Sequence, residues 1–249
     1  IDKFTDTDFE LSTAMKSTGE AMSIGRTFPE SLLKALRSSE YTPAVDFETV
    51  DDDELEAQYL VRPSPDRPYA IFEAFLRGYT VEEVVELTDI HEWYVERFAE
   101  VADAAEAAMA GDYETAAAAG FTDQEITALA GGEFNDTHVS WLPAGLDADA
   151  AATDGSGVQI EDVESETVHR DYKLVDTCAG EFEATTPYYY SARDPISTLA
   201  RDELQVDREA ESVVVVGGGP IRIGQGVEFD YCSVHAIQAL RELGVDAHV

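Results

Sequence analysis

Four helix-start signals between residues 27 and 125 constrain the fold of this chain more than any other feature. In each, a Thr or Asp that can accept hydrogen bonds from the first free amides of a helix is followed three residues later by a Glu that can bond back. The pairs are Thr27 and Glu30, Thr80 and Glu83, Asp89 and Glu92, and Thr122 and Glu125. The repetition predicts an all-helical unit of antiparallel neighbours with short connections over residues 28–142.

Apolar residues at helical spacing place the individual helices of this unit. Leu32, Leu33 and Leu36 line the first helix. The others are expected between Pro68 and Gly78, around Val81 to Val85, from Ile90 to a stop before Gly111, and over residues 113–119 and 123–130. We interpret these stripes as core and not as a cofactor site.

The last 39 residues, 211–249, carry a different pattern. Val213 to Val216 form a continuous β-branched run, which predicts a strand buried on both faces of a parallel sheet. Tyr231 to Leu243 has helical spacing with Gly244 as a stop, and residues 244–249 begin another strand. The fold class is therefore mainly α, followed by the first βαβ unit of a Rossmann-like domain.

The loop inside that unit, "GGGPIRIGQGVEFDYC" at residues 217–232, fits neither common glycine-rich fingerprint. The dinucleotide pattern needs glycine where Arg222 stands, and the phosphate-loop pattern needs lysine where Gln225 stands. Backbone amides and a helix N-terminus at this place still favour anions. From the loop alone, a flexible turn and a phosphate or anion site remain equally open.

Charge limits the partners. Fifty-two acidic residues against 16 basic ones give a net charge of -36, which repels nucleic acid and anionic membranes. We expect neither as a partner, and we expect a halophilic source, in which dense salt screens the repulsion. The segment 143–168 is acidic and polar throughout, so we expect a solvated linker there.

The remaining features point to a reducing, cytoplasmic setting. Cys178 and Cys232 lack the spacing of a disulfide framework or zinc site, and the five histidines lack metal-ligand spacing. No apolar run of membrane-spanning length occurs, and the N-terminus resembles neither a signal peptide nor a natural start, so the chain begins like an excised piece. Residues 1–27 are expected as strand and turn, and residues 169–210 as irregular or extended structure.

Four segments, in this order, resemble the large subunit of carbamoyl phosphate synthase. They are "MKSTGEAMSIGRTFPESLLKALRS" at 15–38, "AFLRGYTVEEVVELTDIHEWYV" at 74–95, "VDTCAGEFEATTPYYYS" at 175–191 and "GGGPIRIGQGVEFDYCSVHAIQALRELG" at 217–244. The first and last are the most specific, because long runs match in residue type and spacing.

The resemblance implies the domain order of the middle of such a subunit. Residues 1–27 would be the tail of the first ATP-grasp half, and residues 28–142 the helical oligomerisation or connection domain. An acidic linker or insertion at 143–168 would be followed by the C-terminal part of the connection domain and a linker at 169–210. Residues 211–249 would open the second pre-ATP-grasp domain.

The resemblance also implies an activity for the whole enzyme. It would make carbamoyl phosphate from bicarbonate, two ATP and ammonia, with the ammonia released from glutamine by a small glutaminase subunit, for arginine or pyrimidine synthesis. ATP, Mg²⁺ or Mn²⁺, and K⁺ would bind outside this span, so we expect no catalytic, cofactor or metal residue here and no turnover by the segment alone. Its partners would be the remainder of the large subunit, the small subunit and a second copy through the helical domain.

Within that family, carbamate passes through the interior, and four residues match positions that line the passage. Glu20 comes from the first half, and Gly224, Gly226 and Glu228 come from the second. Glycine without a Cβ leaves space for a small anion, whereas the carboxylates fit a gating or hydrating role better than a binding one. The alternative is that Glu20 and Glu228 cap helices or pair with Arg26 or Arg222.

Two competing hypotheses remain. The chain could be a self-contained α/β protein whose strand, loop and helix hold a nucleotide or phosphate. Alternatively, its helical unit could be only a self-association module.

Overall fold

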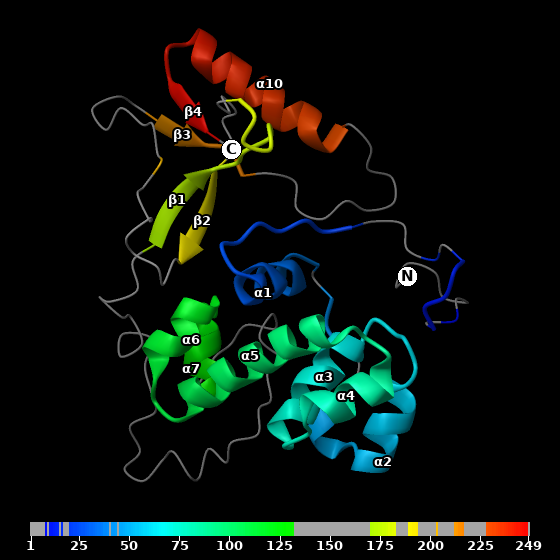
Figure 1. Ribbon diagram of the computed structural model, residues 1–249. Helices are drawn as coiled ribbons and strands as arrows, with labels where there is room; N and C mark the ends of the chain where they lie inside the picture. Colours follow the sequence, from blue (N-terminus) through cyan, green and yellow to red (C-terminus); the bar gives the residue numbers. More distant parts are fainter. Residues whose placement is uncertain are drawn as a thin grey trace.

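The computed structural model describes residues 8, 10–14, 16, 20–39, 41–43, 45–131, 170–182, 189–193, 203, 212–216 and 228–248. Three structural parts follow one another in the chain (Figure 1): a helical unit, a pair of antiparallel strands and a small strand–helix–strand unit. The acidic segment 143–168 and the loop 217–227 lie outside the described residues.

The helical unit contains every helix expected from the apolar stripes. Its elements are α1 (Phe28–Ser39), η1 (Phe47–Thr49), α2 (Asp52–Glu54), η2 (Leu55–Leu60), α3 (Arg67–Leu76), α4 (Val81–Thr88), α5 (Glu92–Met109), α6 (Tyr113–Ala119) and α7 (Asp123–Leu129). Residues 132–142 of the predicted unit are outside the described part of the chain. Glycines in the left-handed region at 78, 111 and 120 follow α3, α5 and α6, as the stop signals predicted.

Helix α5 forms the centre of the unit, and α1, α3, α4, α6 and α7 all pack against it. The apolar side chains that meet there form one continuous core, which confirms that the stripes are core. Its most deeply buried members include Leu33, Leu55, Leu60, Ile71, Val84, Val95, Val101, Phe121 and Ile126.

The helix-start signals have mixed outcomes. Thr80 with Glu83 and Thr122 with Glu125 both form the reciprocal capping box. The prediction at Asp89 is wrong: this residue ends α4 with a left-handed φ of 55°, and His91 caps α5 instead by accepting from the amide of Trp93. Three residues, 89–91, connect the two helices, so Asp89 serves as the C-terminal stop of α4 and the N-cap of α5 is His91, immediately before Glu92.

The signal at Thr27 is half correct. The Glu30 amide donates to Thr27 Oγ1 at 3.3 Å. The Glu30 carboxylate, however, does not return to Thr27 but accepts from the Arg26 amide at 2.7 Å. The Glu30 carboxylate therefore binds the backbone one residue before the expected position, and this contact belongs to the site described below.

The helical segments η1, α2 and η2, between residues 45 and 60, were not predicted from the sequence. Asp51 caps α2 by accepting from the Glu54 amide at 2.9 Å, and Leu55 and Leu60 of the π-helical segment η2 are fully buried. Their apolar residues are too widely spaced for the ordinary helical period, because a π-helical turn contains more residues than an α-helical one.

The antiparallel pair consists of β1 (Arg170–Leu174) and β2 (Tyr189–Arg193), with Tyr172 opposite Ser191. This region was expected to be irregular or extended, so the strand pairing adds detail. The pair lies beside α1 and α6 in Figure 1, and β2 contacts α6.

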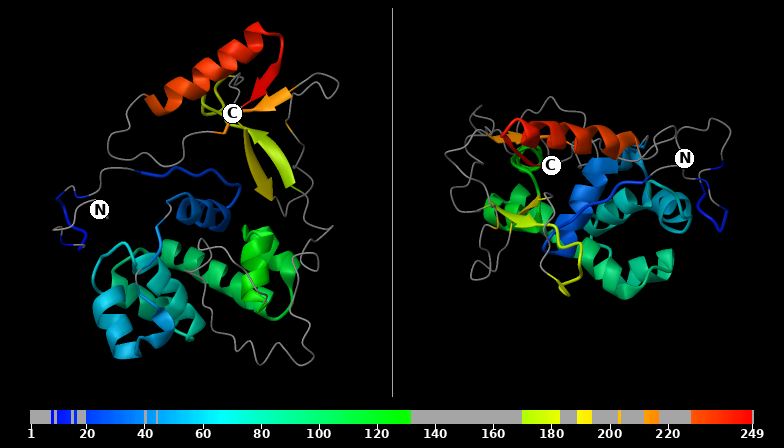
Figure 2. Two further views of the ribbon diagram at one scale, coloured as in Figure 1. Left: turned by 180° about the vertical axis from the view of Figure 1, so that it is seen from behind. Right: turned by 90° about the horizontal axis from the view of Figure 1, so that it is seen from above.

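The C-terminal unit consists of β3 (Ser212–Val214), α10 (Glu228–Glu242) and β4 (Asp246–His248), with β3 and β4 paired in parallel. The strand–helix–strand order agrees with the prediction, while its membership of a Rossmann-like domain stays a prediction. Helix α10 begins three residues earlier than expected, at Glu228, and Gly244 with φ of 79° follows its end. The views from behind and above in Figure 2 show α10 along one side of the two strands.

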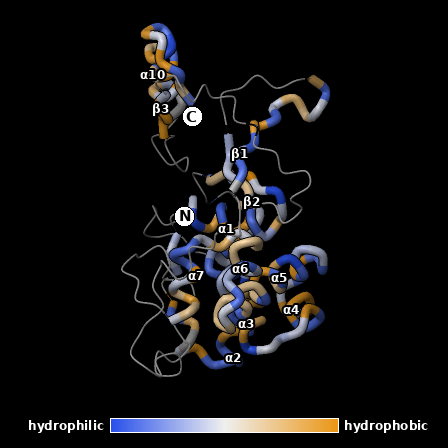
Figure 3. The backbone as a smooth tube through the Cα atoms, turned by 90° about the vertical axis from the view of Figure 1, so that its left-hand side faces the viewer, coloured by the Kyte–Doolittle hydropathy of each residue, from blue (hydrophilic) through white to orange (hydrophobic). Residues whose placement is uncertain are grey.

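One prediction for this unit is wrong. Val214 and Val216 are 71% and 87% exposed, although the valine run predicted a strand buried on both faces. Within the described residues, α10 is the helix that packs on this sheet, and it covers one face. Figure 3 shows β3 as an apolar stretch lying apart from the helical unit.

Candidate functional site

The four predicted passage residues are only partly visible. Glu20 is exposed and lies in the non-helical segment that leads into α1, and Glu228 is the first residue of α10. Gly224 and Gly226 fall outside the described residues. The passage therefore stays a prediction. The described residues do show how the segment after Glu20 is attached to α1.

The centre of that attachment is the carboxylate of Glu30 on α1. Glu30 is 2% exposed, although glutamate is seldom buried without a partner. One carboxylate oxygen accepts from the Arg26 amide at 2.7 Å, and the other pairs with the Lys34 ammonium at 2.9 Å, one helical turn further on. The buried charge is thus compensated from both sides, as an ionised group in the interior requires.

Lys34 extends the contact to two other segments. Its ammonium donates to the carbonyl of Ile24 at 3.0 Å and to the carbonyl of Ser191 on β2. The same ammonium lies 5.8 Å from the ring centroid of Tyr190, within range of a cation–π contact. One lysine therefore joins α1, the segment before it and a strand 157 residues later in the sequence.

Two glycines allow the backbone to approach Glu30. A Cβ on Gly25 would lie 2.8 Å from the Ser31 amide nitrogen, and a Cβ on Gly120 would lie 2.7 Å from the Glu30 Cα. Gly120 also has φ of 109°, which side chains other than hydrogen rarely tolerate. Close packing at this place thus depends on the absence of side chains at both positions.

Arg37 on α1 makes a second ion pair. Its Nη1 donates to both oxygens of Glu125, at 3.0 and 2.8 Å, and its Nη2 donates to the Gly120 carbonyl at 3.3 Å. Glu125 is 2% exposed and also completes the capping box of α7. The pair fixes α1 to the turn between α6 and α7.

We call the set Gly25, Glu30, Lys34, Arg37, Gly120 and Glu125 the α1 junction. It holds the segment after Glu20, the helical unit and β2 together through buried charges. Its described contacts are ion pairs and hydrogen bonds between segments, so its geometry is suited to fixing segments in place.

Sequence analysis overlooked the role of these residues. The spacing of Glu30 and Lys34, four positions apart on a helix, is a recognisable signal of an ion pair. The pair of Arg37 and Glu125 leaves no such signal, because 88 residues separate its members.

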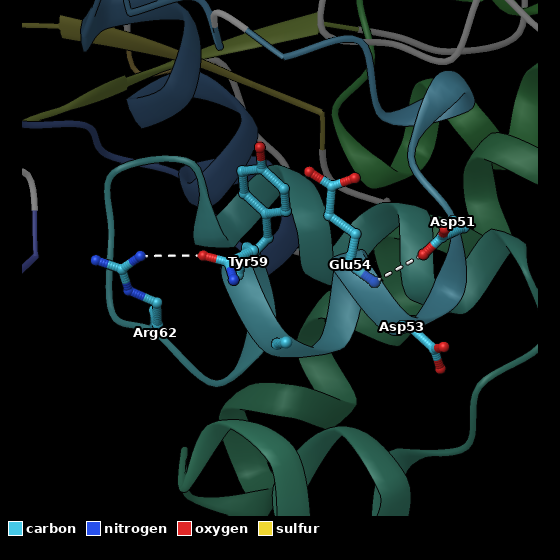
Figure 4. A pocket seen from close by; sticks show the side chains of 7 residues that line it. Asp51, Asp53, Glu54, Tyr59 and Arg62 are labelled. Atoms are coloured by element: carbon cyan, nitrogen blue, oxygen red, sulfur yellow. Dashed lines mark hydrogen bonds between the residues drawn. The ribbon is translucent and has the colours of Figure 1, made fainter.

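A pocket beside α2 and η2 is an alternative candidate site (Figure 4). Asp51, Asp53, Glu54, Tyr59 and Arg62 line it together with Ala57 and Gln58. Asp51 is used as a helix cap, and Arg62 donates to Gln58 Oε1 at 3.0 Å. Across the described residues, no group of His, Cys, Asp and Glu has the arrangement of a metal site, so the pocket offers no evidence for a cofactor.

The cysteines and the helix lengths complete the description of the predicted features. Cys178 and Cys232 are both free thiols. Among the helices that the structure describes, none has the length and apolar character needed to cross a bilayer.

The chain matches two protein-family models. Residues 20–140 match the oligomerisation domain of the carbamoyl-phosphate synthetase large chain, and residues 209–249 match the carbamoyl phosphate synthase preATP-grasp domain. The first match begins at Glu20 and includes the whole α1 junction.

Curated relatives extend the likeness to the whole chain. It is 59% identical to the carbamoyl phosphate synthase large chain of Halobacterium salinarum, 40% to that of Methanoregula boonei and 37% to that of Methanosarcina mazei, each over 100% of this chain. The chain spans 22% of the first relative's length and 21% of each of the other two. The two domain models and the similarity over the whole of this chain indicate the same family. The chain belongs to the carbamoyl phosphate synthase large-chain family.

Proposed function

We propose that the chain serves assembly and the interior carbamate passage of a carbamoyl phosphate synthase, and that it has no catalytic activity alone. The observation that carries this proposal is the α1 junction, where the buried Glu30 holds the backbone of Arg26 and so fixes the segment that begins at Glu20. Such a rigid attachment is what a passage wall requires and what a mobile linker lacks.

The complete enzyme would use one ATP to form carbamate from bicarbonate and ammonia and a second ATP to phosphorylate it. Ammonia would come from glutamine through a small glutaminase subunit. ATP, Mg²⁺ or Mn²⁺, and K⁺ would be held by parts of the large chain other than this one. Carbamate decomposes in water, so its route between two sites must exclude solvent.

The proposed lining consists of Glu20 and Glu228 with Gly224 and Gly226. The exposed position of Glu20 next to an anchored backbone supports its part in this lining. Glu228 is the first residue of α10, and an acidic residue is favoured at this end of a helix.

A variant of each carboxylate tests the passage in the complete large chain with ammonia as nitrogen source. Glu20→Ala and Glu228→Ala should retain bicarbonate-dependent ATP hydrolysis while carbamoyl phosphate output falls. Glu86→Ala, at an exposed position of α4, is the matched control and should change neither quantity. Undiminished output from both passage variants would remove the assignment.

Self-association through the helical unit is the second part of the proposal. Phe28, Trp93 and Tyr94 form an aromatic cluster, in which Trp93 and Tyr94 are 44% and 48% exposed. Aromatic side chains of this kind are enriched in interfaces between proteins. Sedimentation in molar salt should show a dimer that the double variant Trp93→Ser, Tyr94→Ser weakens, and an unchanged mass would assign the contact to another surface.

The competing nucleotide-binding function has a direct test. Calorimetry of the 249-residue chain with ATP or NAD should show no binding. Micromolar binding of either would replace the proposal with a stand-alone nucleotide-binding function.

A further inference from the structure

Lys34 bonds to two segments that lie far apart in the sequence. The carbonyl of Ile24 belongs to the segment that follows Glu20, and the carbonyl of Ser191 belongs to β2, which precedes the C-terminal unit in the chain. Both carbonyls accept hydrogen bonds from the same ammonium, so a movement of either segment must change the geometry of the other bond.

The surroundings make these bonds stiff. Lys34 is 22% exposed in its side chain and Glu30 is 2% exposed, so water competes little for the ammonium. Hydrogen bonds to a charged donor are stronger than neutral ones, and more so when they are shielded from solvent.

The segment before α1 is held on its other side as well. Ser23 Oγ donates to the Ser31 carbonyl at 2.7 Å, and the Arg26 amide is bound by Glu30. Ser23, Ile24 and Arg26 thus tie the segment to α1 at three points within four residues of the chain.

We propose that Lys34 is a positioning residue that couples the two ends of the carbamate passage. It would act through the backbone of Ile24 on Glu20 and through the backbone of Ser191 on the strand pair that leads to the unit of Glu228. This inference rests on the proposed function, because it assumes that Glu20 and Glu228 line one route.

The chain offers a matched control in Arg77. Its guanidinium binds Glu73 and Asp52, both at 2.8 Å, and the Phe47 carbonyl at 2.6 Å. These contacts resemble those of Lys34 in number and kind, but all of them stay within the helical unit. Loss of Arg77 should therefore weaken folding without affecting the passage.

The experiment measures ATP hydrolysed per carbamoyl phosphate formed, in the complete large chain with ammonia. Lys34→Met should raise this ratio between about twofold and thirtyfold, the range expected for residues that couple two sites. Lys34→Arg keeps a cationic donor and should restore much of the coupling. Arg77→Met should lower the melting temperature and leave the ratio unchanged.

A second variant guards against misfolding, because Lys34→Met removes the cation that pairs with the buried Glu30 carboxylate. The double variant Lys34→Met, Glu30→Gln removes both charges, while the Gln amide oxygen can still accept from the Arg26 amide. It should fold and show the same raised ratio. A mere loss of folded enzyme would lower ATP hydrolysis and product together and leave the ratio as it was.

The outcomes separate the two proposals. If Glu20→Ala raises the ratio and neither Lys34 variant does, Lys34 is not a coupling residue and the passage stands. If the Lys34 variants raise the ratio and the Glu20 and Glu228 variants do not, the passage residues are wrong and the coupling by Lys34 stands. If no variant raises the ratio, both proposals fail.

Discussion

The helical unit and the β3–α10–β4 unit bury their apolar residues to different extents. Around α5, leucines and phenylalanines from helices far apart in the sequence are fully enclosed. In the C-terminal unit, Ile237 and Ala247 are buried, but Val214, Val216, Tyr231 and Leu243 are mostly exposed. Apolar residues in both regions predicted burial, and the structure buries them to very different extents.

The difference follows from the geometry of the two architectures. Short helices connected as antiparallel neighbours can enclose a core among themselves. A parallel sheet has two apolar faces and needs cover on both, and one crossover helix supplies cover on one side. The valines of β3 thus mark a surface whose cover is not formed by the described residues.

The largest expected effect is the loss of a core side chain from the helical unit. Leu33→Ala should lower the free energy of unfolding of this chain by about 3 kcal/mol, because Leu33 is fully buried and its removal leaves a cavity. Urea unfolding in molar salt measures the change. Leu243→Ala, at a position 79% exposed, should cost less than about 0.5 kcal/mol, and equal losses at both positions would contradict the contrast between the regions.

Close packing at the α1 junction should give the next largest effect. Gly120→Ala should destabilise the chain by about 2 kcal/mol or more, because it combines a left-handed φ with a Cβ 2.7 Å from the Glu30 Cα. Gly111→Ala has a similar φ of 89° with open space around it, so it should lose only about 1 kcal/mol. Equal unfolding midpoints for the two variants would mean that the backbone at Glu30 can move away from the added Cβ without a loss of stability.

Alkaline pH should weaken the helical unit through Tyr69. Burial raises the pKa of Tyr69 to about 12 from its usual 10.0, with a smaller contribution from the Asp66 charge. The neutral phenol is favoured in the fold, so its stabilisation is complete below pH 10 and is lost as the pH rises towards 12, at about 1 kcal/mol per pH unit.

Tyr69→Phe tests this expectation. The variant should be slightly less stable at pH 8, since the Tyr69 hydroxyl donates to the Tyr41 carbonyl at 3.2 Å. It should also show a flatter decline above pH 10 in urea unfolding. An unchanged slope would assign the alkaline loss to other groups.

Helix caps should contribute about 1 kcal/mol each. Thr80→Ala removes the hydroxyl that accepts from the Glu83 amide and donates to the Glu83 carboxylate, while the backbone amide of residue 80, the main group that lowers the Glu83 pKa, stays in place. Thermal unfolding in molar salt should show the loss. Thr88→Ser, which keeps the hydroxyl that donates to the Val84 carbonyl, is a control outside the cap.

The smallest effect is expected on the sheet. Val214→Thr should change the stability of the 249-residue chain by less than about 0.5 kcal/mol, because the side chain is 71% exposed. In the complete large chain the same substitution should cost more, since a second layer over the sheet would bury the hydroxyl. A loss above about 1 kcal/mol in the 249-residue chain would show that other parts of this chain already cover β3.

Much of the helical unit could be predicted because its signals are local. The capping boxes at Thr80 and Thr122 and the glycine stops at Gly78, Gly111 and Gly120 depend on residues within one helical turn. Asp89 shows the limit: the same residue type can start a helix or end one, and the preceding helix decided the matter.

The α1 junction could not be predicted in the same way. The motif around Glu30 was recognised as a family resemblance, yet its contacts with Lys34, Ser191 and Gly120 were not. A glutamate three residues after a threonine predicts a cap, and its spacing to Lys34 indicates an ion pair, but only the tertiary structure shows that Glu30 is buried against Gly120 and binds the Arg26 amide.

The sequence by itself determined most helices of the helical unit, the order of the parts and the family, because caps, stops and motif spacing act over a few residues. Tertiary structure alone decided which charges are buried together and which valines stay exposed. Lys34 meets Ser191 across 157 residues, and among the residues that the structure describes none covers the exposed valine of β3, because both results depend on which segments pack against each other.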